Sequence, residues 1–271
     1  MKISIMSLFR DSESYIYDCL NRLEQLEANT DASFEYMFYE NDSIDDTRKI
    51  LKDWTKSRQG FFVYEDLGYP KFSTMISRER NYVMTEYRNK LLIASRPFKS
   101  DYTIILDSDV VFDKHIINQY LDYMDDDVAM ATPNVLQNIR CKMFDPDKKS
   151  YYDSYALLDR YENQCMTWAY NPFYFKEDRD LWDNQEPVEV TSAFGGVPMV
   201  RSKILNNVQW STEGGCEHWA FCSMVKKFGK ILAIPTIITE VDVPESIIKR
   251  IPQNDIDEVV KSQHDNLEKV L

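Results

Sequence analysis

Short runs of apolar residues alternate with segments of helical periodicity through the first half of the chain. Strand-like runs cover residues 2–9, 34–39 and 61–64, and each is followed by polar residues and then by a segment with helical spacing of its apolar residues. A long helix over 77–94 then leads to a fourth strand that ends at Asp107. After the first run, the apolar positions with helical spacing are Ile16, Cys19, Leu20, Leu23 and Leu26. This alternation predicts right-handed βαβ units and an α/β fold with a mainly parallel central sheet flanked by helices.

The second half of the chain has a less regular pattern. We expect helices over 113–124 and 151–163. A further helix should begin at Glu217, end near Gly229 and lead to a strand over 230–234. The pattern contains no internal repeat, so we expect a single domain.

Two carboxylates, Asp107 and Asp109, stand one residue apart at the end of the fourth strand. On an extended chain, side chains two residues apart point the same way, about 7 Å apart, so both can converge on one cation or ligand. Burying the pair costs several kcal/mol unless a metal ion or hydrogen-bond donors compensate it. An isolated Asp-x-Asp is also common in ordinary turns, and Asp145-Pro146-Asp147 is such a turn.

The ends of the first, second and fourth strands carry further polar residues. They are the segments 8–11, 39–43 and 107–109. Ligands of parallel α/β sheets bind beyond the carboxyl ends of the strands, so these three segments should line one cleft.

The helix over 77–94 carries a polar stripe, which consists of Arg78, Asn81, Thr85 and Arg88. Such a stripe is usually the solvated face of a helix. Here it could instead bring Arg78 or Arg88 to a diphosphate, because arginine matches phosphate oxygens with two parallel hydrogen bonds.

Four of the seven glycines form two pairs in the second half, Gly195-Gly196 and Gly214-Gly215. Each pair could be a plain tight turn, or a place where backbone approaches a ligand closely. The second pair is followed by Glu217 and His218 at the start of a predicted helix. Two titratable side chains at a helix N-terminus beside Gly-Gly predict a catalytic corner.

Composition narrows the class of protein. The 271 residues are 44% hydrophobic and 13% aromatic, which suits an ordered globule with a sizeable core. A formal net charge of −13 argues against nucleic acid as a partner, because a phosphate backbone needs a basic footprint. The five cysteines are odd in number and lack metal-binding spacing, which favours free thiols in a reducing compartment.

Targeting signals are not evident in the sequence. No apolar run approaches the roughly 18 residues that a membrane span needs, and the N-terminus lacks a small-residue cleavage site. We therefore expect a cytoplasmic or soluble chain without a signal peptide or a transmembrane anchor. This fits a bacterial or viral origin, or a domain excised from a longer protein.

In their order, these segments resemble the GT-A fold of nucleotide-sugar glycosyltransferases. The resemblance rests on residues 40–47, the Asp107-Ser108-Asp109 segment, residues 192–201 and the Glu217-His218 pair ahead of Gly229. The Asn-Asp-Ser-x-Asp-Asp-Thr segment, with Arg78 and Arg88-Asn89, is especially similar to the cryptococcal capsule mannosyltransferase-like group. The resemblance covers roughly residues 2–240 and implies a Rossmann-like N-terminal half.

The resemblance also implies roles for individual residues. The residues implied to bind the nucleotide sugar are Phe9, Arg10, Glu40, Asn41, Asp42, Arg78, Arg88, Asp107, Ser108, Gly195 and Gly196. Those implied to bind a divalent metal, Mn²⁺ or Mg²⁺, are Asp109, Asp107 and His218. The family usually has Glu-Asp where this chain has Glu217-His218, so either residue could be the catalytic base.

The resemblance divides the chain into a catalytic domain over 1–245 and a C-terminal tail over 246–271, which its charged, glycine-free composition predicts to be helical. The domain would comprise a nucleotide-sugar-binding half over 1–109 and an acceptor half over 110–245. The implied activity is metal-dependent transfer of a sugar from a UDP- or GDP-sugar to a hydroxyl of a glycan or glycoprotein.

Two other functions remain open at this point. A haloacid-dehalogenase-like phosphohydrolase also places Asp-x-Asp after an apolar strand, although usually on the first strand of the domain, whereas Asp107 follows three βα units. A non-catalytic sugar-binding module on the same fold would bind glycans without needing a metal or Glu217.

Overall fold

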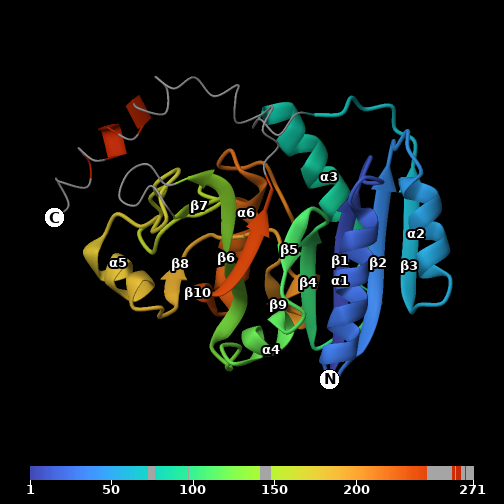
Figure 1. Cartoon of the computed structure of the whole chain (residues 1–271), viewed down its shortest axis with the longest axis horizontal. Helices are drawn as coiled ribbons and strands as arrows, with labels where there is room; N and C mark the ends of the chain where they lie inside the picture. The colour runs from blue at the N-terminus through green and yellow to red at the C-terminus, as the bar shows by residue number, and fades with distance from the viewer. Residues whose placement is uncertain are drawn as a thin grey trace.

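The computed structural model of the chain describes residues 1–72, 77–96, 98–140, 148–242, 258–259, 261–263 and 266 (Figure 1). In this part of the chain, one sheet has the strand order β3-β2-β1-β4-β9-β6-β10-β5, with β7 beside β6 and β8 beside β10. The buried apolar residues also form one cluster. The chain is therefore a single α/β domain with a central sheet flanked by helices, as predicted.

The first half follows the predicted alternation of strands and helices. Its elements are β1 (Lys2–Phe9), α1 (Ile16–Asn29), β2 (Ser33–Asn41), α2 (Thr47–Thr55), β3 (Gly60–Glu65), α3 (Arg78–Ser95) and β4 (Tyr102–Asp107). These four strands are parallel to one another. The buried residues of α1 are the predicted Ile16, Cys19, Leu20, Leu23 and Leu26.

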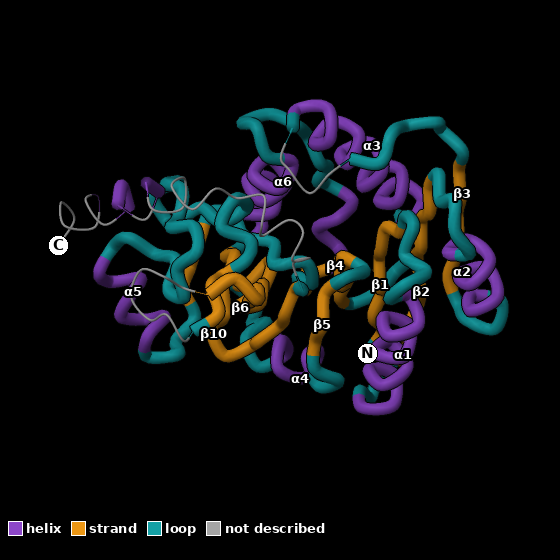
Figure 2. Tube along the Cα trace, turned by 45° about the horizontal axis from the view of Figure 1, so that its top comes forward, coloured by secondary structure: helices purple, strands orange, loops and turns teal. Residues whose placement is uncertain are grey.

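The connections place helices on both faces of the parallel strands. The chain advances in one direction through β1, β2 and β3, so α1 and α2 cover one face. It then returns past β1 to β4, which puts α3 on the opposite face (Figure 2). The carboxyl ends of β1, β2 and β4 meet at one edge, where Phe9 pairs with Glu40 and Leu8 with Asp107.

The second half of the sheet is mixed rather than parallel. Its elements are β5 (Val110–Phe112), α4 (Ile116–Leu121), β6 (Val128–Arg140), β7 (Lys149–Tyr151), α5 (Lys176–Asp183), β8 (Val188–Val190), β9 (Met199–Arg201), η1 (Ser202–Asn206), α6 (Glu217–Val225), η2 (Lys226–Phe228) and β10 (Lys230–Val241). β6 and β10 are parallel, whereas β9 is antiparallel to both β4 and β6. The short strand β9 thus joins the parallel half to the rest of the sheet.

Three sequence predictions need correction in this half. The helix expected over 151–163 is wrong: the segment forms turns and two β-bridges, of Leu158 with Gln164 and with Ser192. The helix expected over 113–124 is shorter, Ile116–Leu121, and the strand expected over 230–234 extends to Val241. The strand is longer because β10 pairs with β6, β8 and β5. The segment 151–163 instead follows the bridges of Leu158 with distant residues.

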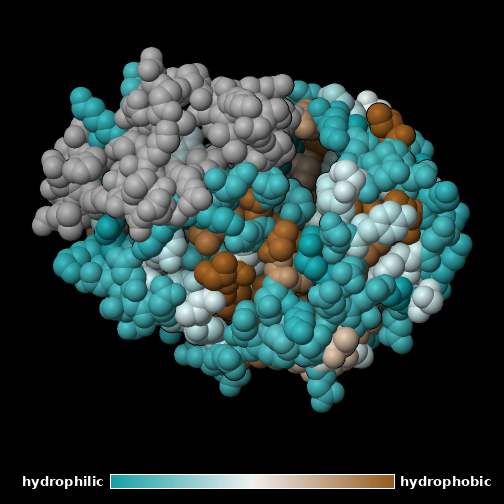
Figure 3. Space-filling view, viewed as in Figure 1, coloured by the Kyte–Doolittle hydropathy of each residue, from teal (hydrophilic) through white to brown (hydrophobic). Residues whose placement is uncertain are grey.

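Other expectations concern the surface and the ends of the chain. The face seen in Figure 3 is mostly hydrophilic. Within the described residues, no helix has the length and apolarity required to cross a membrane. Cys19, Cys165, Cys216 and Cys222 are free and buried, whereas Cys141 lies outside the described residues. Most of the tail over 246–271 also lies outside them, so its helix stays a prediction.

Candidate functional site

The carboxyl ends of β1, β2 and β4 place the predicted acidic pair at the edge of the sheet. β4 ends at Asp107, and Ser108 and Asp109 form a turn before β5. The Ser108 side chain is buried toward α1, with its Oγ 3.3 Å from the hydroxyl oxygen of Tyr15. Ser108 is therefore engaged within the protein, and Asp107 and Asp109 are the groups that a ligand can reach.

The two carboxylates are close enough to affect each other. Loss of solvation and the charge of Asp107 raise the pKa of Asp109 to about 6, although Asp109 remains exposed at the surface. A raised pKa means that the negative charge is undercompensated by the protein alone.

This pair fits a hard divalent cation. Mg²⁺ and Mn²⁺ prefer oxygen ligands, and such ions are commonly held by one or two carboxylates together with substrate phosphates. Among the described residues, no cluster of three or more His, Cys, Asp or Glu side chains could hold a metal by itself. Oxygens of water or of a bound ligand would complete the coordination.

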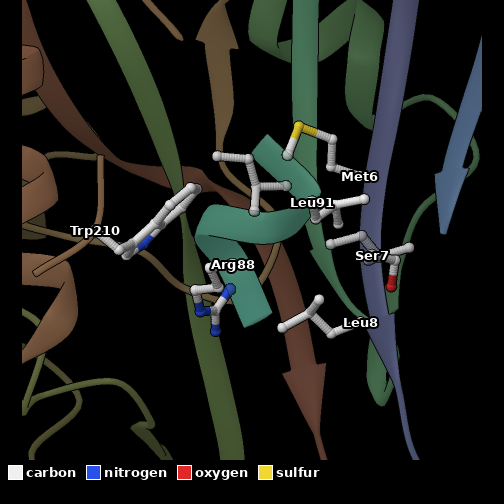
Figure 4. A pocket seen from close by; sticks show the side chains of 8 residues that line it. Met6, Ser7, Leu8, Arg88, Leu91 and Trp210 are labelled. Carbon is white, nitrogen blue, oxygen red and sulfur yellow. The ribbon is translucent and has the colours of Figure 1, made fainter. Parts of the chain in front are cut away.

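Arg88, on α3, supplies a positive charge next to Asp107. Its side chain reaches from α3 and its guanidinium donates to Asp107 Oδ1 at 3.2 Å. It also lies over the Phe194 ring, with Cζ 4.9 Å from the ring centroid. Figure 4 shows Arg88 between Trp210 and the β1 strand. Arg88 is only 6% exposed, so this stripe of α3 faces the protein interior rather than solvent.

Two arginines, Arg78 and Arg80, lie at the start of α3, and the role predicted for Arg78 stays a prediction. Arg78 is exposed, and no contact joins it to the acidic pair. The charge of Arg80 favours the negative form of Asp109 and Tyr152 and disfavours the protonated form of His218, although burial is the largest influence on the pKa of each of the three groups. Helical spacing selected Arg78 because it lies three residues before Asn81 on the polar stripe, whereas Arg80 lies on a different side of the helix.

Three residues expected to contact the nucleoside have buried side chains. Phe9 packs edge-to-face on Phe38 in the core, with ring centroids 5.0 Å apart. The Glu40 carboxylate accepts from Ser43 N at 2.8 Å and from Arg48 Nε at 2.5 Å. Asn41 Nδ2 donates to the Tyr87 hydroxyl and to Asp42 Oδ2. The side chains of Phe9, Glu40 and Asn41 are thus engaged within the protein, and their contact with a ligand stays a prediction.

Arg10 and Asp42 instead organise the loop after β3. Arg10 donates to Tyr69 O at 2.7 Å and to Pro70 O at 3.1 Å. Asp42 Oδ1 accepts from Leu67 N at 2.6 Å and from Gly68 N at 2.8 Å. The loop over 66–70 is thereby held at the same edge as the acidic pair.

The glycine pair Gly195-Gly196 packs directly on Asp107. Both glycines have positive φ, 66° and 70°. Asp107 N donates to Gly196 O at 2.7 Å, and a Cβ added to Gly196 would lie 2.5 Å from Val110 Cγ2. A side chain would not fit there, so glycine permits the close approach of this turn to the acidic pair.

Asp153 also belongs to this site, although the sequence analysis did not identify it. Its Oδ2 accepts from Gly195 N at 2.8 Å. Burial raises the pKa of Asp153 to about 7, and the charges of Asp107 and Glu217 contribute in the same direction. The segment was expected to be helical, so its residues could not be assigned to the site from spacing.

Glu217 and His218 open α6 close to the glycine turn. Glu217 is 3% exposed and its Oε1 lies 3.6 Å from His218 Nε2. The His218 ring stacks on Phe194 with centroids 3.9 Å apart. Burial and the charge of Arg88 lower the pKa of His218 well below its usual value, so the imidazole is neutral near pH 7. Its buried Nδ1 has no hydrogen-bond partner among the described residues.

The second glycine pair shapes the approach to α6. Gly215 O accepts from Asn81 Nδ2 at 2.7 Å and from the Tyr155 hydroxyl at 3.2 Å. Tyr155 in turn lies beside Trp219, with ring centroids 5.5 Å apart. The N-terminal part of α3 and the turn at Gly215 are thereby fixed next to Glu217.

The internal cavity behind Arg88 is not a substrate site. It measures about 10 Å³ and is lined by apolar residues of β1, α3 and β4 together with Ser7, Arg88 and Trp210 (Figure 4). That volume is enough for about one water molecule. A larger ligand therefore does not fit in this cavity.

Solved structures of glycosyltransferases share this fold. Residues 1–349 of S. aureus TarS match with a TM-score of 0.55 at 14% identity, over 98% of this chain and 71% of that chain. The mannosyltransferase PcManGT from Pyrobaculum calidifontis, in complex with GDP-Man and Mn²⁺, matches with a TM-score of 0.53 at 12% identity, over 90% of this chain and 57% of that chain. GalNAc-T7 with UDP, GalNAc and Mn²⁺ matches with a TM-score of 0.52 at 12% identity, over 90% of this chain and 44% of that chain.

Sequence comparison identifies the family. A search of curated protein sequences finds no match. The family model described as glycosyl transferase family 2 matches residues 4–196, which is more than half of the 271-residue chain. The match spans β1, the acidic pair and the first glycine turn. The chain is therefore a glycosyltransferase with a GT-A fold that belongs to glycosyl transferase family 2.

Proposed function

We propose that this enzyme transfers a sugar from a UDP- or GDP-sugar to a hydroxyl group of a glycan or glycoprotein, with the help of a divalent metal. The observation that carries the proposal is the meeting of Asp107 and Asp109 with Arg88 and the Gly195-Gly196 turn at one edge of the sheet. In this assignment residues 1–109 form the nucleotide-sugar half and residues 110–245 the acceptor half.

The acidic pair would hold the metal, and Arg88 would fix its geometry. Asp109 faces solvent and has no compensating ion pair among the described residues, which suits it to bind Mn²⁺ or Mg²⁺. Arg88 donates to Asp107 Oδ1 and so holds this carboxylate in place. The bound metal would offset the negative charge that develops on the departing diphosphate.

Glu217 is the residue we assign as base. A carboxylate can take the proton of the acceptor hydroxyl as its oxygen attacks the anomeric carbon of the donor. Glu217 stands at the start of α6, and the charges of Glu217 and Asp107 both raise the pKa of Asp153. His218 is neutral and close to Glu217, so it is the alternative base. Because Nδ1 of His218 is buried and the imidazole ring stacks on Phe194, we place His218 in a supporting position rather than on the metal.

The neighbouring structures support both the donor class and the metal. TarS was solved with UDP-GlcNAc, PcManGT with GDP-Man and Mn²⁺, and GalNAc-T7 with UDP, GalNAc and Mn²⁺. The finer placement in the cryptococcal capsule mannosyltransferase-like group rests on residues 41–47 and on Arg88-Asn89, and it stays part of the proposal. Family membership favours the transferase over the phosphohydrolase alternative.

The test is a thermal-stability screen with UDP, GDP and their common sugar conjugates, each with Mn²⁺ or with EDTA. A ligand at 100 times its Kd contributes about 2.7 kcal/mol, which is a shift of several degrees for a domain of this size. Stabilisation by one nucleotide only when Mn²⁺ is present would support the proposal and name the donor base. If no nucleotide shifts the transition, the proposed donor class is wrong. Glycan binding that ignores EDTA would favour a sugar-binding module.

A further inference from the structure

Asp153 holds the Gly195-Gly196 turn in place through a hydrogen bond. It follows β7, and its Oδ2 accepts the backbone N–H of Gly195 at 2.8 Å. The backbone of the same segment is fixed as well, since the carbonyl of Asp153 accepts from Ala156 N and Leu157 N at 3.1 and 3.2 Å. The position of the carboxylate is therefore set by the backbone on both sides.

The Gly195-Gly196 turn connects this carboxylate to the acidic pair through hydrogen bonds. Gly195 bonds to Asp153, and the next residue, Gly196, accepts from Asp107 N at 2.7 Å. A Cβ built on Gly196 would come within 3.5 Å of Asp107 Oδ2. Asp153 and Asp107 thus flank a turn that has no side chains, where the backbone allows a ligand to approach closely.

α6 closes the other side of this turn. Cys222 Sγ donates to Ala193 O at 3.4 Å, and His218 stacks on Phe194. The segment before Gly195 is therefore packed against the helix that begins with Glu217. A group bound at the turn would lie between the metal-binding carboxylates and the residue we assign as base.

The second oxygen of Asp153 remains available to a ligand. Among the described residues, Gly195 N is the one donor to this carboxylate, and Oδ1 receives none. Oδ1 is also not among the buried polar atoms that lack a hydrogen-bond partner. Burial and the charges of Asp107 and Glu217 raise the pKa of Asp153, whereas the hydrogen bond from Gly195 N acts in the opposite direction.

We propose that Asp153 recognises the transferred sugar: Oδ2 holds the Gly195 turn while Oδ1 accepts a hydrogen bond from a hydroxyl of the sugar ring. The inference rests on the proposed function and adds a specificity-determining residue to it. A carboxylate oxygen is a strong acceptor for a sugar hydroxyl. A site built to bind a hydroxyl rejects sugars that lack it, because its polar group then stays unpaired.

The variant Asp153→Asn separates the two roles of the carboxylate. The amide oxygen can still accept from Gly195 N, whereas the amide nitrogen replaces the free acceptor with a donor. Asp153→Ala removes both contacts. The probes are the nucleoside diphosphate and the nucleotide sugar of the base that stabilises the wild-type enzyme, both with Mn²⁺. The measurements are Kd for each probe and kcat and KM for the donor.

We expect Asp153→Asn to bind the nucleoside diphosphate as the wild type does, and the nucleotide sugar about 10- to 100-fold more weakly, since hydrogen bonds to charged groups have roughly this value. Equal nucleotide-sugar affinity in Asp153→Asn and wild type would overturn the inference, because Asp153 would then only hold the turn. Equal losses for both probes would also overturn it, by showing an effect through Asp107. A wild-type enzyme that binds nucleoside diphosphate but no sugar conjugate would contradict the proposed function itself.

Deoxy donors identify the hydroxyl that Asp153 accepts. One deoxy sugar should cost the wild-type enzyme affinity and cost Asp153→Asn little, because the partner is already lost. If every deoxy donor weakens the two enzymes by the same factor, no hydroxyl pairs with Asp153 and the inference fails.

Discussion

Asp109 shows how a residue suited to bind a ligand can lower the stability of the ligand-free protein. Its carboxylate is near Asp107, and this charge, together with reduced solvation, raises its pKa to about 6. A group held in an unfavourable charge state is typical of functional sites, because the missing compensation comes from the ligand.

We therefore predict that Asp109→Asn removes transfer without unfolding the protein. The rate should fall by at least about 100-fold, because charge stabilisation by a metal is worth several kcal/mol. The melting temperature near pH 7 should stay equal or rise, since the amide is not repelled by Asp107. Activity assays and thermal melts with and without Mn²⁺ check both parts.

The surface change Asp126→Asn is the matched control for Asp109→Asn. Asp126 is exposed in the run Asp125-Asp126-Asp127, away from the edge that carries the acidic pair. It should leave the transfer rate and the response to Mn²⁺ unchanged. A wild-type rate in Asp109→Asn would show that this carboxylate does not hold the metal.

Glu217→Gln should reduce turnover far more than donor binding. Loss of a general base typically costs about 10²- to 10⁴-fold in rate, whereas the buried amide keeps the volume of the carboxyl group. The check is kcat and donor KM for Glu217→Gln beside His218→Gln. A larger loss of kcat in His218→Gln would transfer the role of base to the imidazole.

At the scale of elements, the strands and helices of the first half were predictable because each one carries its own pattern. The residues of β1, α1, β2, α2, β3, α3 and β4 lie where apolar periodicity placed them. The segment 151–163 was not predictable in the same way. Its turn is set by contacts with residues far along the chain, such as Leu158 with Ser192 and Asp153 with Gly195.

The same limit applies to the site. Asp107 and Asp109 stand out because two charges follow an apolar strand, which is a local signal. Asp153 and Arg80 carry no such signal, since their place depends on how β7 and α3 pack around the edge. Conversely, Phe9 and Glu40 were assigned to the ligand by their position, yet the fold buries their side chains.

The Gly195-Gly196 turn gives a prediction at this scale. Gly196→Ala should destabilise the fold by about 1–3 kcal/mol more than Gly68→Ala, because its Cβ would meet Val110 Cγ2 at 2.5 Å and overpack the site. Gly68 is the matched control: its φ is also positive, 72°, but no atom lies within 4 Å of its added Cβ. Urea unfolding of both variants measures the difference. Equal loss of stability would mean that the turn can relax away from Val110.

At the scale of the whole molecule, the chain has more acidic than basic residues. The net charge of −13 was apparent from composition, and it left the position of the acidic groups open. At the site, the pKa of Asp109 is raised to about 6 and that of Asp153 to about 7. Other acidic groups, such as Asp42 and Glu65, have lowered pKa values and therefore become protonated only at more acidic pH.

The raised pKa values predict how stability depends on pH. Between about pH 4 and pH 7, the folded protein holds protons on Asp109 and Asp153 that the unfolded chain has released, so unfolding becomes easier as pH rises. In EDTA, the melting temperature should fall across this window, and Asp109→Asn combined with Asp153→Asn should flatten the fall. Mn²⁺ should stabilise the wild type more at pH 7 than at pH 5, because a metal binds deprotonated carboxylates. An identical pH profile in wild type and the double variant would show that these two carboxyl groups titrate normally in the folded protein.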